Sequence, residues 1–381
     1  MVIAAVIINL AGGVVYSWSI ISKELILNLH WTSTNATLPY TVNNVAMSFF
    51  WTLGGRIGDK HGPRISALLG GVLMGGGIFL TGFCTTPLTM VITYGIVAGA
   101  GFGFTNSATT ATAIKWFPAE KRGLISGICL SGAAFASVYM APIIQFLLKN
   151  TDIYTTFHCI GIGILVVIVS MALLLSQPQD TLSPSGAKDS VDWKEIFKNA
   201  HYYKLCTLNF LGKAVGLMII GHIAVIAVKQ AQWEGGVILV SLVAVFNGIG
   251  RLTGGAIADK IGVRNSFRII FLLQTANLLV FYYYNTGAYL IIGTAIAGFY
   301  YGGLIANIPA GVASAFGTKN LATNIGLVNT FALFSAALGP LIAGRVFDIT
   351  GNYHYAYLIA AALLVLCFAV ASSMKENQNT G

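Results

Sequence analysis

Two basic side chains stand inside apolar segments of this 381-residue chain, where charged groups are costly. The first is Arg251, which precedes Asp259 at the end of its segment by eight residues. At about 1.5 Å of rise per residue, Arg251 lies roughly 12 Å inside the helix, near the middle of a hydrocarbon layer about 30 Å thick. An arginine there costs about 2.5–3.5 kcal/mol and needs a polar cavity or an anionic partner. No Asp or Glu occurs in any apolar run, so we predict that the partner is a bound anion.

The second basic side chain is Lys213, nine residues beyond Lys204 and so about 13 Å into its segment. One interpretation is that Lys213 adds a second positive charge beside Arg251, which suits a dianion. The other is that it snorkels toward the helix end or is partly neutral, which leaves a site for a monoanion. For Arg251 itself, the alternative to anion binding is a set of hydrogen bonds to backbone carbonyls of neighbouring helices.

A carboxylate is the anion that best fits Arg251, because the planar guanidinium offers it two charge-assisted hydrogen bonds. Polar and aromatic residues near the middle of other segments are predicted to line the same cavity, where rings confine a small organic anion and hydroxyls orient it. These residues are Tyr16, Trp18, Asn106, Tyr139, Asn247, Tyr300, Tyr301, Asn307 and Asn329. For each one alone, ordinary helix packing is at least as good an explanation. We interpret His222 as a packed, neutral histidine, with a proton carrier as the alternative.

Long apolar runs must position these residues. The chain is 56% hydrophobic and only 9% charged, against about 25% charged residues in soluble domains, so it is predicted to be an all-α integral membrane protein. Runs long enough to cross a bilayer are expected at about 1–22, 38–58, 64–83, 88–112, 122–148, 154–176, 203–229, 236–258, 266–285, 288–312, 321–346 and 354–374.

One extended polar stretch divides these twelve transmembrane helices six and six. The expected domains are an N-terminal six-helix bundle over 1–176, a cytoplasmic linker over 177–201 and a C-terminal six-helix bundle over 202–381. Within the linker, residues 193–199 are predicted to form a short surface helix.

A short charged pattern occurs twice, 200 residues apart, and predicts that the two bundles are pseudo-symmetric. It reads Gly-x-x-x-Asp-Lys-x-Gly-x-Arg, starts at Gly55 and at Gly255, and lies each time between two apolar runs. We expect its carboxylates to engage backbone amides and basic neighbours of the adjacent helix and so to act as a conformational latch. The alternative is that the turns only set topology. The latch residues are Asp59, Lys60, Arg64, Asp259, Lys260 and Arg264.

The basic residues outside the apolar runs fall mostly on the side of these two turns. The positive-inside rule then places that side and both termini in the cytoplasm, as in a multi-pass protein of the plasma or inner membrane. The net charge of +9 follows this pattern instead of gathering into a binding surface, so no nucleic-acid partner is expected.

Several other kinds of chemistry find no support in the sequence. The five cysteines are scattered without metal or disulfide spacing, and they are interpreted as small core residues. The glycines from Gly99 to Gly103 lie inside an apolar run with no preceding strand, which excludes a dinucleotide loop. No acid pair or nucleophile–base arrangement stands within the runs, so we expect no enzyme activity, no metal and no cofactor.

The repeated turn, together with the six-plus-six layout, resembles the signature of the major facilitator superfamily over the whole chain. Four further motifs are similar to oxalate/formate antiporters and their monocarboxylate-transporter relatives. They are Tyr16-Ser-Trp-Ser19, Ile114-Lys-Trp-Phe-Pro118 followed by Lys121-Arg-Gly123, Phe246-Asn-Gly-Ile-Gly-Arg251, and Ala322-Thr-Asn-Ile-Gly326 with Gly339-Pro340. The resemblance implies the major facilitator fold and a carboxylate transporter whose eighth-span arginine, Arg251, binds the substrate.

Two residues depart from these relatives. Oxalate/formate antiporters have a lysine in the eleventh span where this chain has Ala332, and proton-coupled monocarboxylate transporters have an aspartate where it has Asn247. We therefore predict a secondary active transporter that moves small carboxylates of the oxalate/formate or lactate/pyruvate type by alternating access as an anion exchanger. The alternatives are a proton-coupled monocarboxylate symporter and a transporter-like nutrient sensor. The expected partners are the carboxylate, the lipid bilayer and a counter-anion or proton, and the expected state is a monomer.

Overall fold

A computed structural model describes residues 1–178 and 193–374, without the side chains of Tyr16, Ser33, Ser137, Val138, Val237 and Ala337. Over these ranges the chain is helical and has no strand, and its helices group into twelve spans, as the sequence predicts. Ten spans are long and apolar enough to cross a membrane on these criteria alone. The other two, α3 (Ser33–His61) and α11 (Val263–Phe281), are diluted by polar residues such as Asn43 and Gln274.

The chain divides into two compact units, each described by itself. Unit 1 comprises Met1–Phe117, Cys129–Trp193 and Gly317–Thr330. Unit 2 comprises Pro118–Ile128, Lys194–Phe316 and Phe331–Gly381. Each unit thus takes one short segment from the opposite half of the sequence, whereas the predicted domain boundaries at 176 and 202 follow the chain order and stay a prediction.

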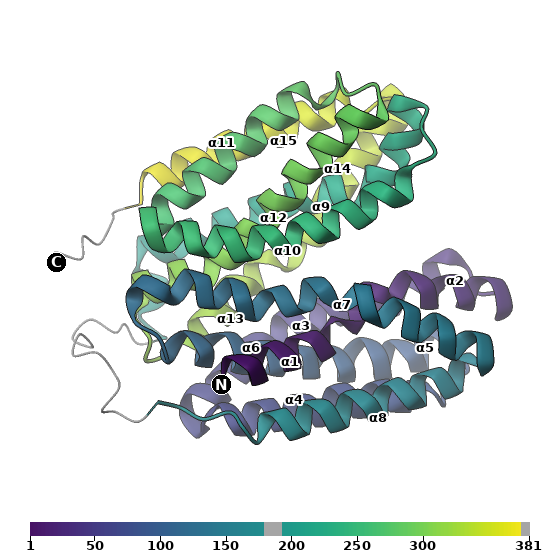
Figure 1. Ribbon diagram of the computed structural model, residues 1–381, viewed down its shortest axis with the longest axis vertical. Coiled ribbons are helices and arrows are strands. Elements are labelled where there is room, and N and C mark those ends of the chain that lie inside the picture. Colours follow the sequence, from purple (N-terminus) through teal and green to yellow (C-terminus); the bar gives the residue numbers. More distant parts are fainter. Residues whose placement is uncertain (179–192, 375–381) are drawn as a thin grey trace. The chain divides into compact units, whose positions relative to one another are not determined.

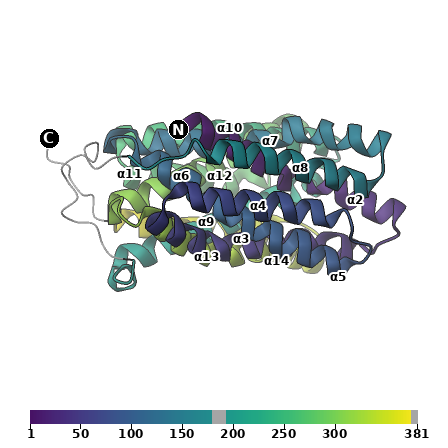
Figure 2. The same cartoon turned by 90° about the horizontal axis from the view of Figure 1, so that it is seen from below.

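Unit 1 is built on the first half of the chain. Its helices are α1 (Val2–Gly12), α2 (Trp18–Asn28), α3, α4 (Pro63–Thr81), α5 (Pro87–Met90), α6 (Gly99–Lys115), α8 (Ile153–Ala172) and most of α7 (Arg122–Asn150) and α13 (Leu321–Phe331). Helix α4 packs against α6 and α8, and α3 packs against α6. Figures 1 and 2 both show α4 and α8 side by side.

Unit 2 is built on the second half. Its helices are α9 (Ala200–Ala231), α10 (Gly236–Ile261), α11, α12 (Gly287–Phe316), α14 (Ser335–Thr350) and α15 (His354–Ser372), with the first turns of α7. Helix α10 packs along α12, α11 along α15, and α9 along α12 and α14 (Figure 1). Arg251 on α10 is therefore positioned by α12 and α9.

The two predicted charged turns form as expected. Helix α3 ends at His61 and α4 begins at Pro63, and α10 ends at Ile261 where α11 begins at Val263. The single residue between each pair is Gly62, with φ of 95°, or Gly262, with φ of 84°. Residues with a Cβ atom rarely adopt positive φ, so these one-residue turns depend on glycine.

Three spans contain breaks that the apolar pattern does not predict. The first span has a 3₁₀ segment, η1 (Gly13–Ser17), between α1 and α2, and the eleventh has one, η7 (Ala332–Phe334), between α13 and α14. The fourth span has a π-helical stretch, η2 (Val91–Ala98), between α5 and α6. In the linker, the predicted surface helix over 193–199 is shorter, a single 3₁₀ turn at η6 (Ile196–Lys198), and the linker residues 179–192 lie outside the described ranges.

Candidate anion-binding site

Arg251 is buried in unit 2 with only 2% of its surface exposed. Its Nε donates a hydrogen bond of 3.0 Å to Oδ1 of Asn247, one turn earlier on α10. The amide oxygen orients the guanidinium but carries no charge. Every Asp and Glu in the described spans lies near a helix end, so the interior of unit 2 offers Arg251 no carboxylate at its own depth.

Two glycines hold the backbone of this turn of α10 in place. A Cβ atom on Gly127, at the start of α7, would lie 2.0 Å from the carbonyl oxygen of Arg251. One on Gly302 of α12 would lie 2.1 Å from the carbonyl oxygen of Asn247 and 2.8 Å from the amide nitrogen of Arg251. Helices on two sides thus approach α10 as closely as backbones can. The site of the arginine is a rigid one.

Lys213 lies on α9, within electrostatic range of the Arg251 guanidinium. Two tyrosines of α12 pack beside it. The Tyr300 hydroxyl donates a hydrogen bond of 2.7 Å to the carbonyl of Gly212, and the Tyr301 ring covers Gly216 so closely that a Cβ there would lie 2.3 Å from it. Unit 2 therefore brings together four of the predicted neighbours of Arg251: Asn247, Lys213, Tyr300 and Tyr301.

Several predicted site residues use their polar atoms in structural hydrogen bonds instead. Asn307 is fully buried and donates to Oγ of Ser266 on α11 at 2.7 Å. In unit 1, Nε1 of Trp18 donates to the carbonyl of Ala36 at 3.0 Å. The Tyr139 hydroxyl donates to the carbonyl of Leu10 at 2.8 Å. For these side chains the packing explanation accounts for what the structure shows.

The remaining predicted lining residues are in unit 1. The amide of Asn106 donates to the carbonyl of Phe102 on its own helix at 2.9 Å. Asn329 is buried on α13. Tyr16 lies in η1, and its side chain is outside the described part of the structure. Their role in binding stays a prediction.

His222 on α9 is held at both ring nitrogens. Nε2 lies 3.1 Å from the carbonyl oxygen of Pro340, which can only accept, so Nε2 carries the proton and donates. Nδ1 lies 3.1 Å from the Tyr353 hydroxyl. Burial, and then the nearby Asp348, raises the pKa of Tyr353, which keeps that hydroxyl protonated. The arrangement fits a packed, neutral histidine.

The two repeated aspartates occupy equivalent places in their own units. In unit 1, Asp59 accepts from the backbone amide of Thr323 at 2.9 Å and from its hydroxyl at 2.8 Å, at the start of α13. In unit 2, Asp259 accepts from the amides of Gly123 and Leu124 at 2.7 Å each, at the start of α7. A carboxylate at a helix N-terminus satisfies free amides and the helix dipole. The amide donors themselves obey the 200-residue offset, since position 123 corresponds to 323.

The two turns differ in their other charges. Asp59 also forms an ion pair with Lys115, Nζ to Oδ1 at 2.8 Å, which is the one ion pair seen within the described residues. Position 315 in the second half is an alanine, so Asp259 has no counterpart to Lys115. Sequence reasoning noticed Lys115 only as part of a motif. Comparing position 115 with position 315, 200 residues later, would have shown that only the first turn has a lysine to pair with its aspartate.

The basic members of the turns have separate tasks. Arg64 Nε donates to the carbonyl of Leu175 at 3.4 Å, and Arg264 Nη2 donates to the carbonyl of Ser372 at 2.6 Å. Each arginine thus ties the beginning of one helix, α4 or α11, to the carboxyl end of the helix packed against it, α8 or α15. Lys60 and Lys260 are exposed.

The fold is shared with solved transporters. The closely similar structures include FucP, an E. coli fucose:proton symporter, in its outward conformation, with a TM-score of 0.76 over 99% of both chains at 15% identity. They also include the human organic anion transporter MFSD10, with a TM-score of 0.73 over 97% of this chain and 98% of that chain at 13% identity. At these identities the similarity establishes the fold alone.

Sequence relatives and a family model identify the chain. The oxalate:formate antiporter of Oxalobacter formigenes is 28% identical over 98% of this chain and 90% of its own length. Monocarboxylate transporter 13 of Rattus norvegicus is 24% identical over 93% of this chain and 83% of its own. The model of the Major Facilitator Superfamily matches residues 2–276 and 222–378, nearly the entire chain. This protein belongs to the Major Facilitator Superfamily of membrane transporters.

Proposed function

We propose that this protein transports small organic carboxylates and that Arg251 binds the carboxylate group. The observation that carries the proposal is a guanidinium with 2% exposure whose hydrogen-bond partner on α10, Asn247, is neutral. A buried cation is stabilised by a bound anion, and the Asp and Glu residues of the described spans lie near helix ends. The named relatives, an oxalate:formate antiporter and a monocarboxylate transporter, support carboxylates as the substrate class.

Exchange follows from the same charge. With a carboxylate bound, the site is close to neutral and the transporter can pass through an occluded state. Without it, the net positive charge of the buried site makes that state costly, by several kcal/mol in a medium of low dielectric constant. The empty carrier therefore returns slowly, and a second anion must load before it does. We propose anion exchange as the mode of transport.

Proton symport is the alternative. Monocarboxylate transporters that carry a proton, as the resemblance implies, use an acid at the position of Asn247, and the described spans hold no acid at that depth. The sequence difference at this one position is what favours exchange. A transporter-like nutrient sensor would bind the anion at Arg251 but would not move it.

Counterflow in proteoliposomes tests the proposal. The purified protein is reconstituted with unlabelled oxalate, formate or lactate inside, and uptake of the labelled acid is followed. Removing one partner of a buried charge-assisted pair costs about 2–5 kcal/mol, so Arg251→Gln should slow uptake by at least about 30-fold. The matched control is Arg345→Gln, which removes an exposed arginine of α14 and should leave uptake unchanged.

Two results would contradict the proposal. Full transport by Arg251→Gln would show that another group binds the anion. Binding of carboxylate by the wild type, shown as thermal stabilisation that Arg251→Gln loses, with no counterflow under any condition, would indicate the sensor instead.

A further inference from the structure

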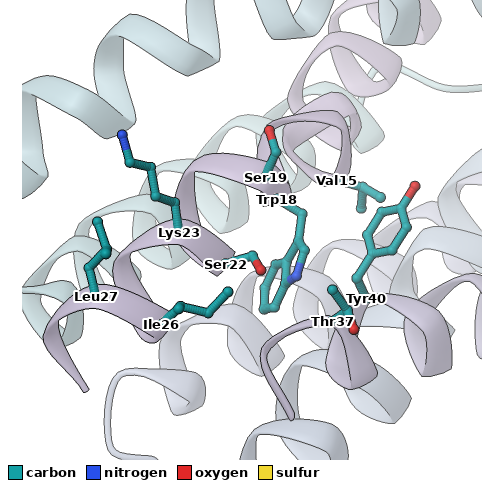
Figure 3. Close-up of a pocket in the computed structure, with 9 residues that line it drawn as sticks. All are labelled: Val15, Trp18, Ser19, Ser22, Lys23, Ile26, Leu27, Thr37 and Tyr40. Atoms are coloured by element: carbon teal, nitrogen blue, oxygen red, sulfur yellow. The ribbon is translucent and has the colours of Figure 1, made fainter. Parts of the chain in front are cut away.

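A pocket of about 610 Å³ lies in unit 1, far from the charged turn of that unit. It is formed between α2 and the first turns of α3 (Figure 3). Tyr40, on its wall, precedes Asp59 by nineteen residues on the same helix, which corresponds to roughly 28 Å. Its volume is within the range of small-molecule sites, about 300–1,000 Å³.

The pocket has an apolar floor. Val15, Trp18, Ile26 and Leu27 line it with carbon atoms, and their exposure runs from 4% for Trp18 to 58% for Leu27. The Trp18 ring is fixed, because its Nε1 is hydrogen-bonded to the carbonyl of Ala36 and its face lies on the Tyr94 ring with centroids 4.2 Å apart. The floor is preformed and does not need to reorganise when a ligand binds.

Polar groups gather on one side of this floor. Figure 3 shows the Lys23 ammonium, the Ser19 hydroxyl and the Tyr40 hydroxyl all directed to the same side of the Trp18 ring. Lys23 is exposed, and among the described residues its ammonium has no hydrogen-bond or ion-pair partner. Lys23 is the one charged residue of the lining.

We propose that this pocket binds an amphipathic monocarboxylate, with its carboxylate at Lys23 and Ser19 and its hydrocarbon part on Trp18 and Ile26. A positive rim requires an anion, and an apolar floor of this size requires a hydrocarbon body, which formate and oxalate lack. The site is separate from Arg251, which belongs to unit 2. Its effect on transport, which rests on the proposed function, is to raise the local concentration of amphipathic substrates and so to lower their KM.

Chemical protection of Lys23 tests the site without any need for transport. The full chain in phosphatidylcholine nanodiscs is treated with an amine-acetylating reagent, and acetylation of Lys23 is followed by peptide mass spectrometry. 3-Phenylpropionate should slow acetylation of Lys23 by about fivefold, the scale of one partly screened ion pair. Formate and the neutral 3-phenylpropionamide should have no effect. Lys149, an exposed lysine in the last turn of α7, is the internal control and should react at the same rate throughout.

Three variants separate this inference from the function proposed for Arg251. Arg251→Gln should keep the full protection of Lys23, and Ile26→Ala should weaken it. Lys23→Gln should raise the KM for 3-phenylpropionate counterflow by about fivefold and leave kcat unchanged. If 3-phenylpropionate still protects Lys23 from acetylation and Arg251→Gln still transports carboxylate, the pocket proposal stands and the function proposed for Arg251 fails.

Other outcomes would overturn the proposal. Equal protection by the amide would remove the role of charge, and equal protection of Lys149 would make the effect non-specific. Protection by phosphatidylglycerol nanodiscs alone, with no further effect of 3-phenylpropionate, would assign the pocket to a lipid.

Discussion

If Arg251 binds the substrate as proposed, Lys213 is predicted to set the charge of the substrate that the site accepts. It lies within electrostatic range of the guanidinium, so a dianion could bind both cations. Hydrogen bonds to charged groups contribute about 1.5–3 kcal/mol, so Lys213→Met should weaken oxalate binding by about 10- to 150-fold and leave formate binding nearly unchanged. Thermal shifts with the two acids measure this. Lys229→Met, an exposed lysine near the end of the same helix, is the control, and equal losses for both acids would exclude a two-cation site.

A titratable side chain at position 247 is predicted to make transport depend on pH. In Asn247→Asp the new carboxylate lies where Oδ1 of Asn247 now accepts from Arg251, 3.0 Å away, and it would compete with the substrate. At neutral pH uptake should fall by at least about tenfold, because a buried ion pair must be broken. As the pH falls the aspartate takes up a proton, Arg251 is released, and uptake should recover. Counterflow between pH 8 and pH 5 measures this, with the wild type over the same range as reference. A variant that shows no recovery in acid would place the substrate elsewhere.

The depth of Arg251, and its burial, could be predicted from spacing to Asp259 alone, because the rise of a helix is fixed. The neighbours could be predicted less well. Tyr300 and Trp18 were expected to present polar atoms to a ligand, but both donate to backbone carbonyls of adjacent helices. The direction of a mid-span side chain depends on how its helix is rotated and packed. The spacing of residues along the sequence does not contain that information.

The helix-capping aspartates differ in what their loss should cost. Asp59→Asn keeps one acceptor oxygen for Thr323 at the start of α13 but removes the negative charge, which leaves Lys115, largely buried, without its ion pair. Asp259→Asn would affect only the amides at the start of α7. We expect Asp59→Asn to be the more destabilising by about 1–3 kcal/mol, the cost of a buried charge left unpaired.

Thermal unfolding measures this difference. Asp59→Asn and Asp259→Asn are each compared with and without Lys115→Met, in two double-mutant cycles. Adding Lys115→Met should restore part of the stability of Asp59→Asn and should do nothing for Asp259→Asn. Lys260→Met, an exposed neighbour, serves as the control. Equal effects of the two aspartate variants would mean that Lys115 contributes nothing to the latch.

At the level of helices, the sequence is informative where one residue type determines geometry. Glycine at 62 and 262 predicts the tight turns, and both have positive φ. The breaks at η1, η2 and η7 have no such marker, because apolar periodicity is nearly the same for α, 3₁₀ and π segments. The capping partners Thr323 and Gly123 come from the opposite half of the sequence, so only tertiary structure reveals them.

For the whole molecule, the prediction of twelve transmembrane helices in the major facilitator fold is confirmed. The composition of the chain and the lengths of its apolar runs were enough to predict the twelve helices. The direction of the chain across the membrane, with both termini in the cytoplasm, stays a prediction from the positive-inside rule. We predict that substrate and coupling depend on single residues such as Asn247 and Ala332, at which the resemblance implies that this chain differs from its relatives. For that reason, similarity over 98% of the chain does not settle them.

The anion exchange proposed above requires the empty transporter to return slowly. Proteoliposomes loaded with labelled carboxylate should release it at least about tenfold faster when unlabelled acid is present outside than when it is absent, because closing the site around Arg251 with no anion bound should cost more than about 1.4 kcal/mol. Exchange of equal charges moves no net charge, so a potassium diffusion potential set with valinomycin should leave the rate unchanged. Equal efflux into buffer without acid, accelerated by an imposed pH gradient, would show that a proton accompanies the anion. That result would identify this protein as a proton-coupled symporter that carries the proton without an acidic side chain at position 247.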